Sequence, residues 1–319
     1  MSLVFLPLLE SQLDHDFLKK KSLRSFELFS HYYKEYYKDR YQDLSFAIFI
    51  ENRLKGYVLC AALNGALTTP DGAVCIVLSN YLPEKDKKKL LTSLLEHLTN
   101  LASQNACEKI LIKDTLDQSC LSRLGELLFN QHFESRLSFE MNIPFLEENF
   151  SISLRKSYKS LINWGRRELK TEFIKKDNLD RKKFNTFQEF HHRISGKITR
   201  SQETWDAQYH MLKEGLGELI LSTYKGQLAA GSIFTDYGDT SIYFTGVYER
   251  DLFEFGISHF ILYEGINRSY NRYQTSKFSL GYFDTDIKDP KWYNIQFFKK
   301  GFCKELTPVI FWSKKVKDE

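Results

Sequence analysis

The same series of expected elements occurs twice along this chain of 319 residues, at an offset close to 170 positions. Residues 46–63 and 218–235 each predict two strands around a short turn, which we place at 52–56 in the first stretch. Lys55-Gly56 recurs as Lys225-Gly226, an offset of 225 − 55 = 170. A chain that repeats a series of this length is expected to fold as two similar units.

Three more elements and a hydrophobic triplet follow in the same order in both halves. They are strands at 74–79 and 241–248, helices at 85–102 and 257–273, strands at 109–114 and 277–282, and the triplets Phe129, Phe133, Leu137 and Phe298, Phe302, Leu306. A hairpin followed by strand, helix and strand is a common local order. However, the strands at 109–114 and 277–282 are separated by an offset of 277 − 109 = 168 residues, and the triplets by an offset of 298 − 129 = 169. This near-constant offset favours a tandem duplication with an α/β (α+β) fold, in which helices flank mixed sheets.

Helix-rich stretches precede both hairpins, at 8–41 and 181–214. In the helix at 85–102, leucines recur at helical spacing and predict one buried face. The polar, aperiodic segment 144–150 separates the halves, and a helix at 153–170 opens the second. The sequence therefore predicts two domains, residues 1–148 and 149–319.

Composition is that of a globular protein, with 42% hydrophobic and 27% charged residues. The net charge of +4 permits a phosphate-bearing partner without requiring one. Five scattered cysteines without a CxxC pair favour a reducing compartment. The first residues lack the basic start of a signal peptide, and no stretch reaches the roughly 20 apolar residues that span a bilayer. We therefore expect a cytoplasmic protein without a membrane span.

Three segments of the second half resemble a known family. They are SLRKSYKSLINWGRREL (153–169), GKITRSQETW (196–205) and FSLGYFDTDIKDPKWYNIQFFKKGF (278–302). The repeated unit resembles the GNAT acyltransferase fold, and the tandem pair resembles the FemABX-like family of peptidyl and aminoacyl transferases. This resemblance implies transfer of an acyl or aminoacyl group to an amine, often on a cell-envelope precursor.

The donor implied by the resemblance is an aminoacyl-tRNA or an acyl-CoA, used as co-substrate with no permanently bound cofactor. Classical family members carry a long helical arm that contacts tRNA. This sequence has no heptad-patterned insertion of that kind, which leaves acyl-CoA open as the donor.

The turn into the helix at 257–273 is the candidate site for the phosphates of the donor. It carries Phe255, Gly256, Ile257 and Ser258, and a glycine before a helix lets backbone N–H groups approach a phosphate. Acidic residues in the loop oppose an anion, and a simple helix entry capped near Ser258 is the alternative. The matching loop at 81–86 has no glycine, so we assign donor binding to the second half.

Basic residues mark the helix at 153–170. They are Arg155, Lys156, Lys159, Arg166, Arg167 and Lys170. Arg155 and Lys159 are four residues apart and would be neighbours on a helix. Such a cluster suits a pyrophosphate on the acceptor, and a solvated helix face is the alternative.

Acyl transfer to an amine needs a polarised carbonyl, a deprotonated amine and a protonated leaving group. The resemblance places Lys299, after Phe298, where the family has a Phe-Lys pair, and implies that it stabilises charge at the reacting end of the donor. Lys300 takes this role if the register shifts by one. The resemblance also implies that Tyr282 ends the strand directed at the leaving group, to which a phenol can donate a proton. Asp284 could accept a proton or orient the amine, and sheet packing is the alternative for Tyr282.

Acceptor binding is assigned to a loop between two helices and to one strand residue. Gly196, Thr199, Arg200 and Trp205 form a segment that could bind an anionic or sugar ligand. Ser201 with Glu203 also makes an ordinary helix start, which accounts for part of the pattern. Tyr243 is the further substrate-binding candidate.

Other enzyme classes lack their motifs. His191 and His192 are adjacent, so a helix points them about 100° apart, and we predict no metal site. GxSxG and Walker motifs are absent from the sequence. The leading hypothesis is an acyltransferase acting on an amine of a cell-envelope or surface-polysaccharide precursor, with a small-molecule or lipid-linked acceptor and tRNA as a candidate partner. A non-catalytic GNAT-fold binding module and a small-metabolite N-acetyltransferase are the alternatives, and the oligomeric state is open.

Overall fold

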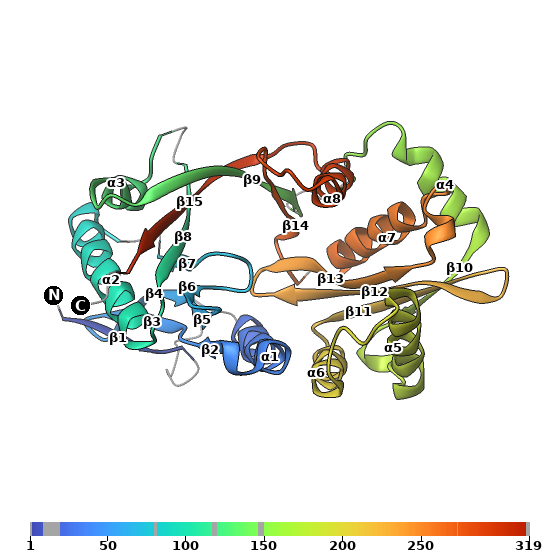
Figure 1. The fold of residues 1–319 in the computed structure, drawn as a ribbon, viewed down its shortest axis with the longest axis horizontal. Helices are drawn as coiled ribbons and strands as arrows, with labels where there is room; N and C mark the ends of the chain where they lie inside the picture. Colours follow the sequence, from blue (N-terminus) through green and yellow to red (C-terminus); the bar gives the residue numbers. More distant parts are fainter. Residues whose placement is uncertain are drawn as a thin grey trace. The chain divides into compact units, whose positions relative to one another are not determined.

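The computed structural model describes residues 2–8, 20–79, 82–116, 120–145, 150–272 and 274–316. The chain divides into two compact units (Figure 1). Unit 1 comprises Met1–Leu23, Tyr37–Ser138 and Pro308–Glu319, and Unit 2 comprises Arg24–Tyr36 and Phe139–Thr307. The boundary expected between residues 148 and 149 lies outside the described residues and stays a prediction. Tyr81, Tyr273 and part of the helix expected at 8–41 also lie outside them.

Both copies of the repeat contain the expected elements. The first contains β1 (Leu3–Pro7), α1 (Lys20–Tyr37), β2 (Tyr41–Asp43), β3 (Phe46–Ile50), β4 (Arg53–Leu59), β5 (Ala61–Leu63), β6 (Ala66–Thr68), β7 (Cys75–Leu78), α2 (Glu84–Gln104), β8 (Lys109–Thr115), α3 (Arg123–Asn130) and β9 (Glu134–Pro144). The second contains α4 (Tyr158–Glu168), β10 (Leu169–Ile174), α5 (Arg181–Ser195), α6 (Gln202–Lys213), β11 (Gly217–Tyr224), β12 (Gln227–Tyr237), β13 (Thr240–Tyr248), α7 (Ile257–Asn271), β14 (Lys277–Phe283), α8 (Pro290–Lys300) and β15 (Thr307–Lys315). The α/β (α+β) class and the duplicated order are confirmed.

The predicted turn of the first hairpin was wrong. The chain reverses at Glu51–Asn52, both with positive φ, and Gly56 lies inside β4 opposite Ile48. A bulge between Ile48 and Phe49 leaves Lys55 as the extra residue. In the second copy the turn is at Lys225-Gly226. The two Lys-Gly pairs are therefore not structural equivalents, because an Asn that adopts the left-handed conformation closes the first turn just as Gly226 closes the second.

Most of the last strand of each copy belongs to the unit built mainly from the other copy. Phe139–Pro144 of β9 pair antiparallel with β14, within Unit 2. β15 pairs antiparallel with β8 over Val309–Lys315, within Unit 1. Each compact unit therefore contains strands from both copies, so neither copy completes a unit alone.

Unit 1 carries one sheet in the order β1-β3-β4-β7 and a second series in the order β15-β8-β6-β5-β2. Leu90, Leu94 and Leu98 of α2 are fully buried, as the leucine spacing predicts. The repeated triplet keeps only its central residue in the same environment in both copies. Phe133 and Phe302 are buried, whereas Phe129 is 64% exposed and its counterpart Phe298 is half-buried.

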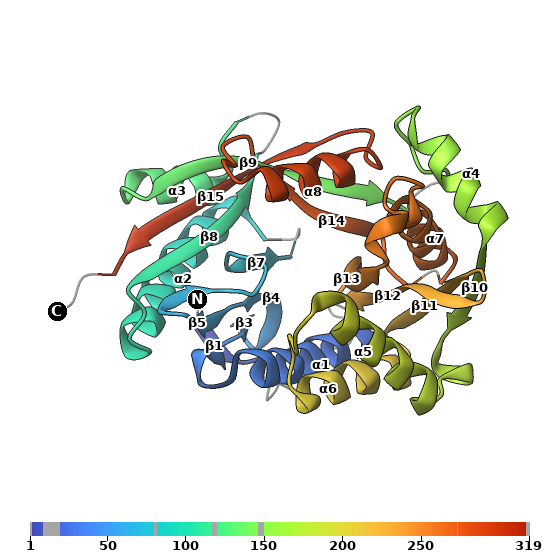
Figure 2. The same cartoon turned by 45° about the vertical axis from the view of Figure 1, so that its right-hand side comes forward.

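Unit 2 is built on the strand order β10-β11-β12-β13-β14-β9. Helix α7 covers one face of the central strands, and α5 and α6 cover the other (Figures 1 and 2). The Arg24–Tyr36 part of α1 joins the α6 side, where Phe29 contacts Tyr237 and Phe244. No helix among the described residues combines the length and apolarity needed to cross a bilayer.

The basic helix α4 packs directly on α7. A Cβ at Gly165 would lie 2.3 Å from the Phe260 ring, so the two helices approach as closely as a glycine allows. Tyr158 and Ile162 of α4 are buried, and Leu169 follows them into the same core. The helix begins at Tyr158, five residues later than predicted, because Arg155–Tyr158 form a turn in which the Arg155 carbonyl accepts from Tyr158 N–H at 2.9 Å.

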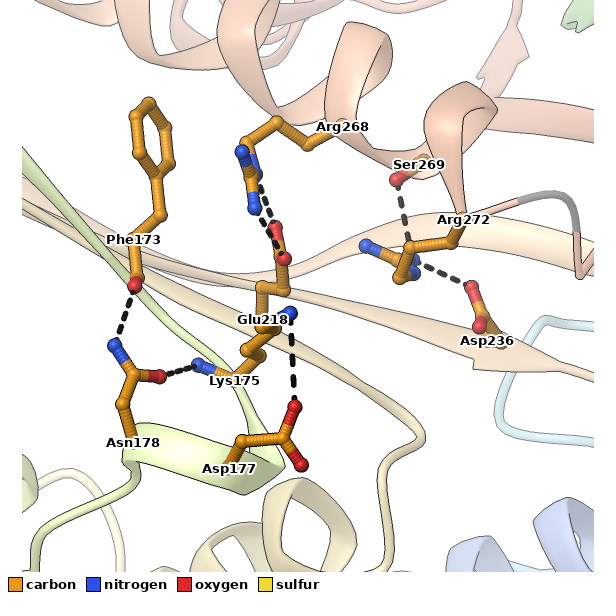
Figure 3. Close-up of polar contacts among 9 residues, drawn as sticks. All are labelled: Phe173, Lys175, Asp177, Asn178, Glu218, Asp236, Arg268, Ser269 and Arg272. Carbon is orange, nitrogen blue, oxygen red and sulfur yellow. Dashed lines mark hydrogen bonds and ion pairs between the residues drawn. The ribbon is translucent and has the colours of Figure 1, made fainter.

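Two arginines one helical turn apart anchor α7 to the sheet (Figure 3). Arg268 donates two hydrogen bonds to the Glu218 carboxylate of β11, at 2.6 and 2.7 Å. Arg272 donates to Asp236 of β12 at 2.7 Å. Only 3% of the Glu218 side chain and 1% of the Asp236 side chain are exposed. Both carboxylates therefore depend on their arginines for neutralisation.

Asp236 also ties together the starting ends of β13 and β14. Its carboxylate accepts from the Ser241 hydroxyl at 2.7 Å, and Ser241 Oγ lies 2.8 Å from Thr275 Oγ1, two residues before β14. We call Asp236, Ser241, Arg272 and Thr275 the Asp236 clasp. The clasp fixes β13 and β14 side by side at the end where both begin.

We predict that Arg268→Met destabilises the protein by about 3–5 kcal/mol, because Glu218 is left as a buried, uncompensated charge. Replacing both partners by Met is expected to restore most of this loss. Urea unfolding measures both effects. Lys183→Met removes an exposed ion pair with Glu172 and serves as the control, with an expected cost of about 0–1 kcal/mol. Equal losses for Arg268→Met and Lys183→Met would contradict the prediction.

Candidate functional site

Two neighbouring parallel strands of Unit 2 part after a short paired stretch. β13 and β14 pair only through Thr240–Ile242 and Lys277–Ser279, although they continue to Tyr248 and Phe283. Along that length β13 still pairs with β12, and β14 still pairs with β9. Their facing backbone groups therefore meet no strand among the described residues, and such groups can hydrogen-bond an extended ligand.

A bulge in β13 sends consecutive side chains to the same face of the sheet. Ile233 pairs with Thr245 and Phe234 with Tyr243, so Phe244 is the extra residue. Phe244 packs on Tyr32 of α1, and Thr245 accepts from the Gln208 amide of α6 at 3.0 Å. A regular strand would have turned one of these two residues toward α7. The bulge thus places Thr245 on the α5/α6 face beside the parted strands.

Tyr243, a predicted substrate contact, lies on the opposite face, in the core between the sheet and α7. Its hydroxyl is 2.9 Å from that of Tyr248, which accepts from Ser232 at 3.0 Å. Burial raises the pKa of Tyr243 and raises that of Tyr248 well above its usual value. The three hydroxyls form a neutral chain that runs along the face of β12 and β13.

The start of α7 carries the four residues predicted to bind the donor. Gly256 has φ of +82°, and a Cβ there would lie 2.4 Å from Leu161 Cβ, so packing on α4 alone requires glycine. Ile257 is fully buried, and Ser258 is half-buried. Phe255 is 43% exposed and stacks on Trp164. His259 N–H already donates to the Gly256 carbonyl at 2.9 Å, so Ile257 and Ser258 carry the remaining first-turn N–H groups of α7 after β13.

The three predicted catalytic residues lie on β14 and on α8, which pack together. Tyr282 is half-buried near the end of β14, beside a bulge in its pairing with β9. Asp284 follows, and its N–H donates to the Gln296 side chain of α8 at 2.9 Å. Lys299 is half-buried on the last turn of α8, whereas Lys300 lies over the Phe283 ring at 4.7 Å. Their catalytic roles stay predictions.

Arg155 and Phe298, two predicted substrate contacts, pack within Unit 2. Arg155 lies outside α4, so its expected helical neighbourhood with Lys159 was wrong. Its guanidinium stacks on the Phe297 ring at 4.1 Å and donates to the Phe297 carbonyl at 3.3 Å. Phe298 belongs to the core, and its carbonyl accepts from Tyr158 at 3.0 Å. Lys159 is exposed on α4.

Sequence reasoning missed His259, in the first turn of α7. Its ring centroid lies 4.3 Å from that of Tyr158 and 4.8 Å from that of Phe298. Burial, and then the charge of Arg155, lower its pKa to about 4. Nδ1 is buried without a hydrogen-bond partner among the described residues. No local motif signals this site, because Tyr158 and Phe298 come from segments far away along the chain.

Arg200 is the centre of the loop predicted to bind the acceptor. Gly196 ends α5 in the left-handed conformation, and Ser201 caps α6 by accepting from Thr204 N–H, so both helices fix the loop. The Arg200 guanidinium lies 5.3 Å from the Trp205 ring and 5.8 Å from the Tyr36 ring. It also donates to the Thr199 hydroxyl at 3.3 Å. Trp205 is fully buried, so it supports Arg200 from inside the fold.

His191 fixes the orientation of Arg200. Arg200 Nη1 lies 3.3 Å from His191 Nε2, and since a guanidinium only donates, that nitrogen accepts. Nδ1 then carries the proton and faces Ser195 Oγ at 3.3 Å. Burial, followed by the charge of Arg200, lowers the pKa of His191 to about 4. The histidine is therefore neutral at physiological pH and adds no second charge.

Arg200 has no carboxylate partner among the described residues, although it is half-buried. Its Nε is buried and unpartnered, as is the Oε1 atom of Gln208, whose amide group donates to Thr245 and Tyr32. A partly buried cation without a counter-ion is costly, and an anionic ligand would offset that cost. We call Tyr32, Tyr36, His191, Arg200 and Gln208 the Arg200 site.

In the first copy, the position matching Tyr282 at the 168-residue offset is Asp114, because 282 − 168 = 114. Asp114 is 8% exposed and accepts from the Ser122 hydroxyl, which caps α3. Burial raises its pKa despite that hydrogen bond. The end of β8 is thus joined to α3 by internal hydrogen bonds. Within the described residues, no cluster of three His, Cys, Asp or Glu side chains is placed to hold a metal ion.

Neither a protein-family model nor a curated protein matches this sequence. Solved structures do match over most of the chain. FemX is similar with a TM-score of 0.63 over 97% of both chains, at 13% identity. A tandem GNAT protein from the clavulanic acid biosynthesis pathway, solved without acetyl-CoA, is similar with a TM-score of 0.53 over 100% of both chains, at 8% identity. L-PGS from Bacillus licheniformis has a TM-score of 0.55 over 88% of this chain and 85% of that chain, at 10% identity. The chain therefore has the tandem GNAT fold.

We predict that acidification destabilises the protein between about pH 6.5 and pH 4 in part through His191. Folding lowers its pKa, so the unfolded chain binds the extra proton as the pH falls, and the free energy of unfolding decreases. His191→Gln is expected to reduce this slope by up to roughly 1.4 kcal/mol per pH unit. Denaturant unfolding across this pH range measures it. The exposed His31→Gln is the control, and an unchanged slope in His191→Gln would contradict the assignment.

Proposed function

We propose that this protein transfers an acyl or aminoacyl group to an amine, with the donor held between β13 and β14. The observation that carries this proposal is the parting of these strands after three paired residues in a tandem GNAT fold. The gap offers backbone donors and acceptors to the extended arm of a donor. The start of α7 adds first-turn N–H groups for its phosphates.

The reaction that fits this arrangement is direct displacement. The acceptor amine attacks the donor carbonyl, a C–N bond forms, and the C–S bond of a thioester or the C–O bond of an ester breaks. The amine loses a proton and the leaving group gains one. In this scheme Lys299 stabilises charge at the donor, Tyr282 protonates the leaving group and Asp284 orients the amine.

The Arg200 site is the proposed position for an anionic part of the acceptor. It lies on the α5/α6 face of the sheet, where Thr245 flanks the parted strands, whereas the start of α7 belongs to the opposite face. Acceptor and donor would thus approach the gap from opposite faces. Arg200 would pair with the negative charge of a phosphate or carboxylate. We propose that this group belongs to a cell-envelope or surface-polysaccharide precursor in the cytoplasm.

Acetyl-CoA and aminoacyl-tRNA are both candidate donors. The names of two similar solved structures are relevant to the choice of donor. The clavulanic acid pathway protein was solved without acetyl-CoA. The other structure is the C-terminal domain of a putative lysylphosphatidylglycerol synthetase from Agrobacterium fabrum, with a TM-score of 0.54 at 9% identity. Incubation of the protein with each donor and with amino-sugar nucleotides tests the proposal by the mass gained on the acceptor. Folded protein that transfers from neither donor would favour the non-catalytic binding module.

We expect Arg200→Met to raise the KM for an anionic acceptor about 10- to 100-fold with little change in kcat, since charge-assisted hydrogen bonds are worth about 1.5–3 kcal/mol. Steady-state kinetics with varied acceptor measure this effect. Arg181→Met removes an exposed arginine from α5 and should leave the KM unchanged. A loss confined to kcat would contradict a role of Arg200 in binding the acceptor.

We expect Lys299→Ala to lower kcat about 10²–10³-fold if Lys299 stabilises developing charge, as loss of one such donor does in other enzymes. Lys300→Ala tests the alternative register, because Lys300 lies over the Phe283 ring. Single-turnover rates with saturating donor separate chemistry from binding. If Lys299→Ala kept full activity and Lys300→Ala lost it, the charge-stabilising role would belong to Lys300.

A further inference from the structure

Two neighbouring segments of Unit 2 carry many cations and no acid. Residues 150–167 contain five Lys and Arg, and residues 290–304 contain four, with no Asp or Glu in either. Arg155 N–H donates to the Gly301 carbonyl at 2.8 Å, so the two segments are in contact. The whole chain has a net charge of only +4, so this surface concentrates the positive charge.

Helix α8 exposes large aromatic side chains, one of which, Phe297, contacts Arg155. Trp292 is 57% exposed, Tyr293 45% and Phe297 43%, and none of the residues of α8 is fully buried. Helices of globular proteins normally bury an apolar stripe, so an 11-residue helix with three exposed rings is unusual. We call Arg155, Lys156, Lys291, Trp292, Tyr293 and Phe297 the α8 face.

The cations of the α8 face are available to an external anion. In the part of the chain that the structure describes, Arg155, Lys156 and Lys291 form no ion pair with a carboxylate. Two acids that flank α8 have contacts of their own: the Asp289 side chain caps the helix by accepting from Lys291 N–H, and Glu305 pairs with Lys304. An exposed cluster of this kind attracts polyanions.

The arrangement of the rings favours an anionic membrane over a nucleic acid as the polyanionic partner. The Arg155 guanidinium lies 4.1 Å from the Phe297 centroid, and the Tyr293 ring lies 6.0 Å from it at an interplanar angle of 17°. Phe297 is thus already stacked within the protein, which leaves less of its ring for a nucleobase. A lipid surface needs only exposed ring edges beside lysines, which is the residue combination found at membrane interfaces.

We propose that the α8 face docks Unit 2 onto an anionic membrane surface. Trp292 and Tyr293 enter the headgroup region, while Lys156, Lys291 and Arg155 meet the lipid phosphates. Membrane attachment of this kind is peripheral and depends on both apolar contact and charge. It does not require the proposed transfer reaction, and it would bring the protein to acceptors carried on lipids.

Cosedimentation with vesicles tests this proposal. Phosphatidylcholine vesicles that contain phosphatidylglycerol should bind the protein, pure phosphatidylcholine vesicles should bind it far less, and added salt should weaken the binding. Vesicle binding should also shift the fluorescence of Trp292 to shorter wavelength. Trp205 and Trp312 are buried and should not respond, whereas Trp164 of α4 is half-buried. The shift is therefore measured in Trp164→Phe protein, in which the further change Trp292→Phe should abolish it.

Matched variants separate the α8 face from general charge and hydrophobicity. Lys156→Glu with Lys291→Glu should weaken binding to anionic vesicles at least about tenfold. Lys85→Glu with Lys88→Glu makes the same charge change on α2 of Unit 1 and should weaken it much less. Trp292→Ala should weaken binding severalfold, whereas Phe129→Ala removes a 64% exposed ring from α3 and should not.

Three results would overturn the proposal. The first is no binding to anionic vesicles at low salt. The second is an equal loss of binding in the α8-face variants and in their Unit 1 controls. The third is tight binding of single-stranded RNA that the α8-face variants abolish while vesicle binding is absent, which would identify a nucleic acid as the partner. Because none of these measurements uses transferase activity, they stay informative if the proposed reaction is wrong.

Discussion

A buried carboxylate, Asp236, holds together the end of the sheet from which the candidate site opens. It accepts hydrogen bonds from Arg272 of α7 and from Ser241 of β13, and Ser241 reaches Thr275 just before β14. These contacts fix the two strands where both begin. Beyond Ile242 the two strands no longer pair with each other.

The gap between the strands acquires two different sides because of a single bulge. Phe244 and Thr245 both point to the α5/α6 face, whereas Tyr243 and Tyr248 remain in the core beneath α7. The Arg200 site lies on the first face, with a cation that lacks a carboxylate partner among the described residues. The start of α7 lies on the second, with the first-turn N–H groups of Ile257 and Ser258. The proposed donor and acceptor positions depend on this division.

The two copies of the repeat have diverged where the chemistry is proposed. In Unit 1, Asp114 and Ser122 join the end of β8 to α3, and Asp114 stands at the sequence position that matches Tyr282 of Unit 2. The copies also remain dependent on each other, because β9 completes the sheet of Unit 2 and β15 pairs with β8 in Unit 1. Duplication therefore produced one protein whose units share strands.

The sequence by itself determined the repeated order of elements, the buried leucine face of α2 and the acid-free basic segments, because each rests on local periodicity or composition. It misplaced the first hairpin turn, since a Lys-Gly pair suggested a turn that Glu51–Asn52 make. It also assumed a helix around Arg155, whose side chain instead packs on α8.

Only the tertiary structure brought Tyr32 and Tyr36 to Arg200, and Tyr158 and Phe298 to His259. It alone placed the bulge that turns Thr245 toward Gln208, and it alone revealed where β13 and β14 part. The physical reason is that these contacts join residues far apart in the chain. Their pKa values and unpaired groups arise from burial, which no local pattern specifies.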